Sequence, residues 1–297
     1  MLPLTPAHQH SLRAPISCVG VGLHSGRRVS VTLHPASADD GIVFRRGDLR
    51  TDVPARFDHV ADARLATTVG IGGARVGTIE HVMAALAGSA IDNVVVELDG
   101  PELPILDGSA APWLFLLDCA GVVAQPEARR VIEVLRPVRV ADGAAWAELA
   151  PPDAYDGLEL NVSIDFPAAA IGRQSASLRF TPDAFRHRIA RARTFALAED
   201  IAALREAGLA LGGSLENAVV VDGGRVLNPG GLRMADEFVC HKLLDAIGDL
   251  ALAGAPLRGR FRAHRPGHAL HNRLLRALFA DRAAWREGAR EAELAAA

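Results

Sequence analysis

Cysteine is scarce in this 297-residue chain, and its scarcity excludes several kinds of fold and site. The three cysteines, Cys18, Cys119 and Cys240, are odd in number and far apart in the sequence. They cannot form a disulfide framework, and they favour a reducing, cytoplasmic compartment. A Cys-x-x-Cys pair is also missing, which excludes a structural zinc ribbon.

Long apolar runs and an excess of positive charge are missing as well. The longest apolar stretch, residues 113–124, contains Asp118 and is too short to span a membrane. Residues 1–21 lack the basic and apolar segments of a secretory signal. The net charge is −3 without a basic run, so no nucleic-acid partner is expected. No basic amphipathic helix is present, which leaves only a transient contact with a membrane surface open.

Nucleophile and nucleotide motifs are absent too. No Gly-x-Ser-x-Gly occurs and no cysteine has a nucleophile context, so serine and cysteine hydrolases are disfavoured. The glycines of residues 20–26 match neither a Walker nor a dinucleotide pattern, and a hairpin turn is the better interpretation.

Periodic apolar residues predict that both halves of the chain run from several strands to a helix that carries a histidine beside acidic groups. The first half has predicted strands at 19–35 (two strands joined at Ser25-Gly26), 42–44, 53–57, 67–76 and 94–98, and helices at 79–87 and 112–119. The second half has predicted strands at 131–140, 146–149, 158–166, 177–180, 219–226 and 258–263, and helices at 181–192, 198–207, 237–249 and 269–280. A frayed or solvated helix is expected at the C-terminal tail, and the polar segment 125–130 is the predicted domain boundary. The pattern suggests a duplicated α+β architecture, although the halves share too little sequence to establish it.

Helix 237–249 carries three polar residues at intervals of four, His241, Asp245 and Asp249, in an apolar setting. This spacing places their side chains on one helix face. Burying carboxylates is costly unless they are paired, hydrogen-bonded or bound to a metal. We therefore interpret His241 and Asp245 as metal ligands, with a helical ion pair as the alternative.

The first half supplies a candidate third ligand, His81, preceded by Glu80. Two histidines and one carboxylate leave a coordination position for water, which is typical of catalytic zinc and also fits Fe(II). Glu80 would then be the general base that takes a proton from water. The alternatives are a histidine satisfied within the core and a glutamate that favours a helix N-terminus.

Two more residues are candidates for chemistry. His268 follows a Pro-Gly turn and could be a general acid oriented by a carboxylate such as Asp249, or else a capping or surface residue. Lys242 could hold an anion or a developing oxyanion, or else be a solvated charge. Eight other histidines have no partner at ligand spacing, and most are expected at the surface: His8, His10, His24, His34, His59, His187, His264 and His271.

Three long motifs, at residues 78–88, 241–249 and 267–272, closely resemble those of the UDP-3-O-acyl-N-acetylglucosamine deacetylases. This family comprises the zinc amidases of lipid A biosynthesis in Gram-negative bacteria. Shorter matches lie at residues 20–26, 104–112, 191–195 and 211–214, so the resemblance covers nearly the whole chain in order.

The resemblance implies two similar α+β domains, residues 1–127 and 128–297, each a mostly antiparallel sheet packed on helices. The active site would lie at their interface. Zinc would be held by His81, His241 and Asp245, and would polarise the acetamide carbonyl for attack by water that Glu80 activates. The remaining roles implied are oxyanion stabilisation by Thr194 and the zinc, protonation of the leaving amine by His268 held by Asp249, and substrate binding by Lys242. Acetate and a free glucosamine amine would result.

The resemblance also implies a passage for the 3-hydroxyacyl chain, formed by an insert at about 195–213. Five residues would contact the substrate: Leu65, Asp165, Phe166, Phe195 and Arg265. Ala145 stands where the family often has a lysine, which leaves the diphosphate contact unassigned, and acyl length is not carried over. A monomer is expected. Two other functions remain open: a zinc amidohydrolase acting on another N-acyl sugar, and a non-catalytic, metal-stabilised binding protein.

Overall fold

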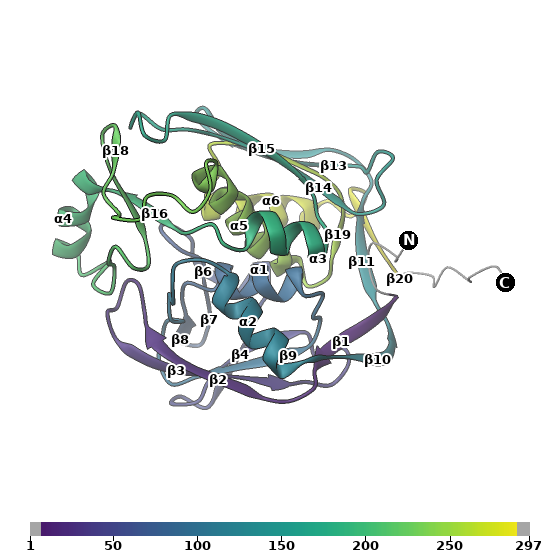
Figure 1. Cartoon of the computed structure of the whole chain (residues 1–297). Helices are drawn as coiled ribbons and strands as arrows, with labels where there is room; N and C mark the ends of the chain where they lie inside the picture. The colour runs from purple at the N-terminus through teal and green to yellow at the C-terminus, as the bar shows by residue number, and fades with distance from the viewer. Residues whose placement is uncertain (1–6, 290–297) are drawn as a thin grey trace.

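The structure, a computed structural model, describes residues 7–289. Two sheets with the same strand order form its outer layers (Figure 1). In spatial order the first sheet contains β2 (Ile16–Val21), β3 (Arg28–Pro35), β9 (Val94–Leu98), β4 (Ile42–Arg46) and β5 (Thr51–Pro54). The second contains β12 (Val138–Asp142), β13 (Ala145–Ala150), β19 (Leu257–His264), β14 (Leu158–Asp165) and β15 (Arg173–Arg179).

The repeat extends to strand direction. Among the five repeated strands of each sheet, the one that comes last in the sequence lies at the centre, antiparallel to one of its neighbours in the repeat and parallel to the other. All other pairs among these ten strands are antiparallel. The predicted α+β architecture of two similar, mostly antiparallel units is confirmed.

Helices fill the space between the two sheets (Figure 1). They are α1 (Glu80–Gly88), α2 (Ala111–Ala120), α5 (Glu237–Leu250) and α6 (His268–Ala280). Because α1 directly precedes β9 and α5 precedes β19, the two helices occupy equivalent positions in the repeat. Every residue of α5 except Lys242 is buried, as is every residue of α1 except Ala87. Such helices are covered on all sides, so the charged residues that they carry, such as Glu80, Asp245 and Asp249, are buried as well.

Smaller elements complete the fold. Three small sheets are formed by β1 (His8–Leu12) with β10 (Val122–Ala128), by β6 (Val60–Asp62), β7 (Thr68–Ile71) and β8 (Ala74–Val76), and by β16 (Phe195–Leu197), β17 (Val219–Asp222) and β18 (Arg225–Val226), with α4 (Ala198–Glu206) following β16. The second large sheet is extended by β11 (Arg130–Val134) and β20 (Trp285–Ala289). The short helical turns are η1 (Phe57–His59), α3 (Pro182–Ala184), η2 (Phe185–Ile189) and η3 (Ala251–Ala253).

Three predicted elements were wrong in part. The strand predicted at 131–140 is two strands, β11 and β12, separated around Pro137, which has no N–H for a ladder. The helix predicted to reach residue 192 is capped by Thr181 as expected, but it ends at Ile189 after a π-helical turn. Trp285–Ala289 is a strand paired with β11 rather than part of a frayed helix, and residues 290–297 lie outside the described residues.

The predicted boundary segment 125–130 is not a free linker. β10 continues through it to Ala128 and pairs with β1. The division between residues 127 and 128 stays a prediction. Within residues 7–289 we find no helix that is both long and apolar enough to cross a membrane.

Candidate metal centre and active site

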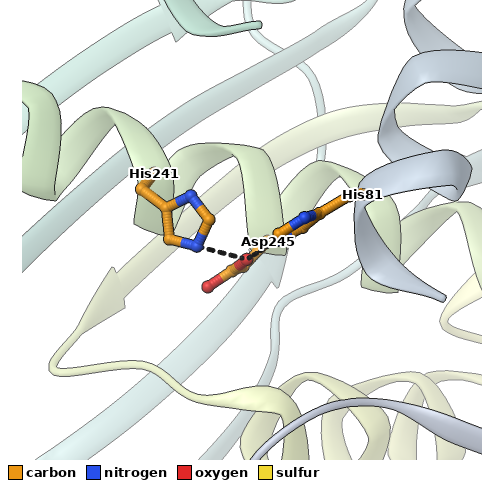
Figure 2. A group of neighbouring side chains, drawn as sticks. All are labelled: His81, His241 and Asp245. Carbon is orange, nitrogen blue, oxygen red and sulfur yellow. Dashed lines mark ion pairs between the residues drawn. The ribbon is translucent and has the colours of Figure 1, made fainter. Parts of the chain in front are cut away.

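His81, His241 and Asp245 converge in the layer between the two sheets (Figure 2). His81 comes from the first turn of α1, while His241 and Asp245 lie one turn apart on α5. The Oδ1 atom of Asp245 is 3.3 Å from His241 Nε2 and 3.9 Å from His81 Nε2. All three side chains are buried, and their potential ligand atoms lie within 4.8 Å of one another.

The hydrogen bonds around these residues leave three atoms for a metal ion. His241 Nδ1 donates to the carbonyl of Ala192 at 3.1 Å, which directs Nε2 toward Asp245. Lys242 Nζ donates to Asp245 Oδ2 at 2.8 Å. Asp245 Oδ1, however, is buried without a hydrogen-bond partner among the described residues. An orphaned carboxylate oxygen is costly in the interior, and two imidazole nitrogens beside it complete a typical zinc ligand set. The residues present therefore fit a divalent metal ion.

The protonation states suit ligation. Burial lowers the pKa of His81 to about 3 and also lowers the pKa of His241, so both imidazoles are neutral at physiological pH. Burial alone would raise the pKa of Asp245, but His241 and Lys242 hold it well below its usual range. Neutral imidazoles and a carboxylate are the forms that bind metals.

Glu80 is fixed beside this centre. Its Oε2 accepts a hydrogen bond from the backbone N–H of Thr67 at 3.0 Å, and its Oε1 lies 4.0 Å from His268 Nε2. Burial raises the pKa of Glu80 to about 7. Gly248 of α5 permits this approach, because a Cβ there would lie 2.0 Å from the Glu80 carbonyl oxygen. The absence of a side chain at Gly248 thus determines how closely α1 and α5 pack.

Asp249 orients His268 on the other side of Glu80. Its carboxylate accepts hydrogen bonds from His268 Nδ1 at 2.8 Å, from His271 Nδ1 at 2.7 Å and from Thr67 Oγ1 at 2.5 Å. Burial alone would raise the pKa of Asp249, but His268 and these hydrogen bonds keep it well below its usual range. Burial would likewise lower the pKa of His268, yet the charges of Asp249 and Glu80 raise it to about 10. His268 is therefore protonated near neutrality, with Nε2 facing Glu80.

Sequence reasoning missed two of the residues around Asp249. His271 was expected to lack a partner and to lie at the surface, but it is fully buried and donates to Asp249. Its position one helical turn after His268 was an available signal. Thr67 could not have been found from spacing, because 182 residues separate it from Asp249.

Comparison with known proteins identifies the family of the chain. The family described as "LpxC: UDP-3-O-acyl N-acetylglycosamine deacetylase" matches residues 9–280. The chain belongs to this family. Relatives named UDP-3-O-acyl-N-acetylglucosamine deacetylase include one from Idiomarina loihiensis, 50% identical over 93% of this chain and 91% of its own length. Those from Acidithiobacillus ferrooxidans and Haemophilus influenzae are each 48% identical over 93% of this chain, and over 91% and 92% of their own lengths.

Several residues that resemblance to the deacetylases assigns to the substrate lie together beside His241. The ring of Phe195 lies 6.2 Å from that of His241 and 5.4 Å from that of Phe166, and Lys242 Nζ lies 5.4 Å from its centroid. Asp165 is the last residue of β14, and Arg265 directly follows the neighbouring parallel strand β19. Their substrate contacts stay predictions.

Three further positions of the deacetylase pattern can be placed. Thr194 is partly buried, and its backbone N–H donates to the carbonyl of Gly108 at 2.8 Å, which ties it to the first half. Leu65 lies half exposed on the loop between β6 and β7, two residues before Thr67. Ala145 opens β13 opposite Asp142.

The predicted passage insert, residues 195–213, comprises β16, α4 and the turn that follows. No residue of α4 is fully buried, and Leu211 is 53% exposed. The backbone N–H of Leu211 donates to the carbonyl of His24, so the end of the insert contacts the first half. Apolar side chains are thus available on this element, as an acyl-binding role requires.

Proposed function

We propose that this protein hydrolyses the acetamide of UDP-3-O-[(3R)-3-hydroxyacyl]-N-acetylglucosamine to the free amine and acetate, the committed step of lipid A biosynthesis. The observation that carries the proposal is the convergence of a three-atom metal-ligand set with a carboxylate and a protonated imidazole 4.0 Å apart. Metal-assisted hydrolysis of an amide uses such a combination, in which one group takes a proton from water and another supplies a proton to the leaving nitrogen.

We propose zinc as the cofactor, held by His81, His241 and Asp245, although the same ligands would accept Fe(II). When bound, zinc lowers the pKa of water and polarises a carbonyl. Lys242 fixes the orientation of Asp245 from one side, and the carbonyl of Ala192 fixes His241 from the other. The chain thereby holds the ligands in place before any substrate arrives.

In the proposed mechanism Glu80 takes the proton of the attacking water on its carboxylate, which the N–H of Thr67 holds in position. A pKa near neutrality suits a general base. His268 then gives its Nε2 proton to the leaving amine, and Asp249 orients its ring through Nδ1. Thr194 would stabilise the oxyanion.

Substrate binding is proposed to use the cluster beside His241. Lys242 and Phe195 would help hold the substrate, and residues 195–213 would bind the acyl chain. The sugar-nucleotide region would be lined by Leu65, Asp165, Phe166 and Arg265. We further propose that the protein acts as a monomer in the cytoplasm, and that its two domains are residues 1–127 and 128–297.

The test compares the Glu80→Gln variant with wild type for zinc content and for acetate release from the acylated UDP sugar. We expect unchanged zinc content and a loss of turnover by at least about 10²-fold, the range that a general base contributes. Full turnover in the variant would refute the mechanism.

A second substrate distinguishes the alternatives. Wild-type turnover of non-acylated UDP-N-acetylglucosamine at the rate of the acylated sugar would favour an amidohydrolase acting on other N-acyl sugars. A zinc-loaded wild type that turns over neither sugar would favour a binding protein.

A further inference from the structure

A cavity of about 470 Å³ lies between the two halves of the molecule, away from the candidate active site. It is bounded by the C-terminal ends of the two equivalent helices, with Ala87 on α1 and Leu250 on α5, and by the junction of β10 and β11. The catalytic candidates Glu80 and His81 lie at the other end of α1. Seven residues separate Glu80 from Ala87, which corresponds to about 10 Å of helix. The cavity is therefore a separate site.

The walls of this cavity are mainly apolar. They include Ile42, Ile91, Leu158, Phe180, Ile247 and Leu257. Cavities of a few hundred cubic ångströms with apolar walls and a small number of placed polar groups are the usual form of small-molecule sites. The polar groups therefore decide what kind of molecule could bind.

Arg129 is a polar residue of the cavity wall whose hydrogen-bond donors are only partly engaged by the rest of the protein. Its side chain is only 6% exposed, and its Nε donates to Asp92 Oδ1 at 2.7 Å. No hydrogen bond from its two terminal nitrogens occurs among the described residues. Asp92 offers little more, because its Oδ2 already accepts from the N–H of His10. A buried guanidinium with unused donors at a cavity wall is suited to a planar anion, which it can bind through two parallel hydrogen bonds.

The other charged residues at the cavity limit the negative charge that a bound ligand can carry. Arg56 and Arg130 also line it, but each is about half exposed and near an acidic side chain. Asp39 and Asp40 line it as well, and their carboxylates accept from Gln9 and from the N–H of Ser37. With Asp92 the acidic groups equal the arginines in number, so a dianion would meet more repulsion than a monoanion.

We propose that this cavity binds an amphipathic monocarboxylate, with the carboxylate on Arg129 and the apolar body among the aliphatic walls. Decanoate is the probe, and decan-1-ol is its uncharged counterpart of equal chain length. Binding of each to the zinc-loaded full chain is measured by titration and by the concentration-dependent rise in melting temperature.

We expect decanoate to bind wild type about tenfold or more tightly than decan-1-ol, because a hydrogen bond to a charged group contributes that much. In Arg129→Gln the ratio should fall to about one. Ala255→Leu places a larger side chain into the cavity wall while keeping Arg129, and it should abolish binding of both probes. Ala283→Leu, at an exposed position, is the matched control and should behave as wild type.

The outcomes are decisive even if Arg129→Gln folds poorly, since Ala255→Leu alone tests the location. Decanoate that binds Ala255→Leu with wild-type affinity occupies another place, the acyl region of the active site included, and overturns the proposal. Equal affinities of wild type for decanoate and decan-1-ol would overturn the role of Arg129.

Discussion

Gly248→Ala is the substitution whose effect follows most directly from the geometry. The added Cβ would lie 2.0 Å from the carbonyl oxygen of Glu80, whereas distances under 3.0 Å are essentially never seen for real Cβ atoms. The start of α1 must therefore move away from α5 by at least about 1 Å. That segment carries Glu80 and His81, so both the general base and one metal ligand are displaced.

The Gly248→Ala substitution should reduce activity far more than it reduces stability. Overpacking of this kind lowers the free energy of unfolding by about 1–3 kcal/mol. Replacing glycine by alanine within a helix raises it by about 1 kcal/mol. The free energy of unfolding should thus fall by no more than about 2 kcal/mol. A displacement of 1 Å at reacting groups, in contrast, can reduce turnover about 10²-fold.

The assay is kcat for acetate release at equal zinc occupancy, together with chemical denaturation. Gly224→Ala is the control, since a Cβ there meets nothing within 4 Å and the residue lies in the hairpin between β17 and β18. A Gly248→Ala protein with kcat within twofold of wild type would refute the reasoning that close packing of α1 on α5 positions the base.

Two further predictions concern pH and the support of α5. Asp249→Asn removes a charge that helps to raise the pKa of His268 to about 10. Because His268 must be protonated to act as an acid, the basic limb of the pH profile of kcat/KM should move to lower pH in this variant. A basic limb that does not move would mean that another group donates the proton. Glu237→Gln removes the partner of the buried Arg193 and should lower the free energy of unfolding by about 3–5 kcal/mol, measured by denaturation at pH 7. Burial alone would raise the pKa of Glu237, but Arg193 keeps it below its ordinary value of 4.5, so the stabilisation is present above that pH and is lost as the pH falls through the lower folded value. The variant should lack this part of the acid dependence, and identical stability of both proteins from pH 7 to 3 would contradict the assignment.

Local patterns in the sequence predicted the parts of the site that depend on helical spacing. His241 and Asp245 are four residues apart on α5, and the structure brings His81 to them. Resemblance to the family supplied the pairing of His268 with Asp249, which the structure also has. The ligand spacing can be predicted from the sequence because residues four apart in a helix lie close together on one face.

Contacts between distant segments could not be predicted in the same way. Thr67 reaches Asp249 across the molecule, and Gly248 faces the backbone of Glu80 from the other half of the chain. No local sequence pattern around Thr67 or Gly248 indicates which distant residue it contacts. The duplication was only suspected and its strand order was not predicted, because strand order depends on backbone pairing, which different side chains can produce equally well. Trp285–Ala289 was mistaken for helix because its partner, β11, lies about 150 residues earlier.

The equivalence of α1 and α5 bears on how such a chain could have arisen. Each repeat is a sheet with a helix layer, and the two layers meet where α1 of the first repeat packs against α5 of the second. A solitary repeat would expose this layer to water, so an ancestral single unit would have had to pair with a second copy of itself.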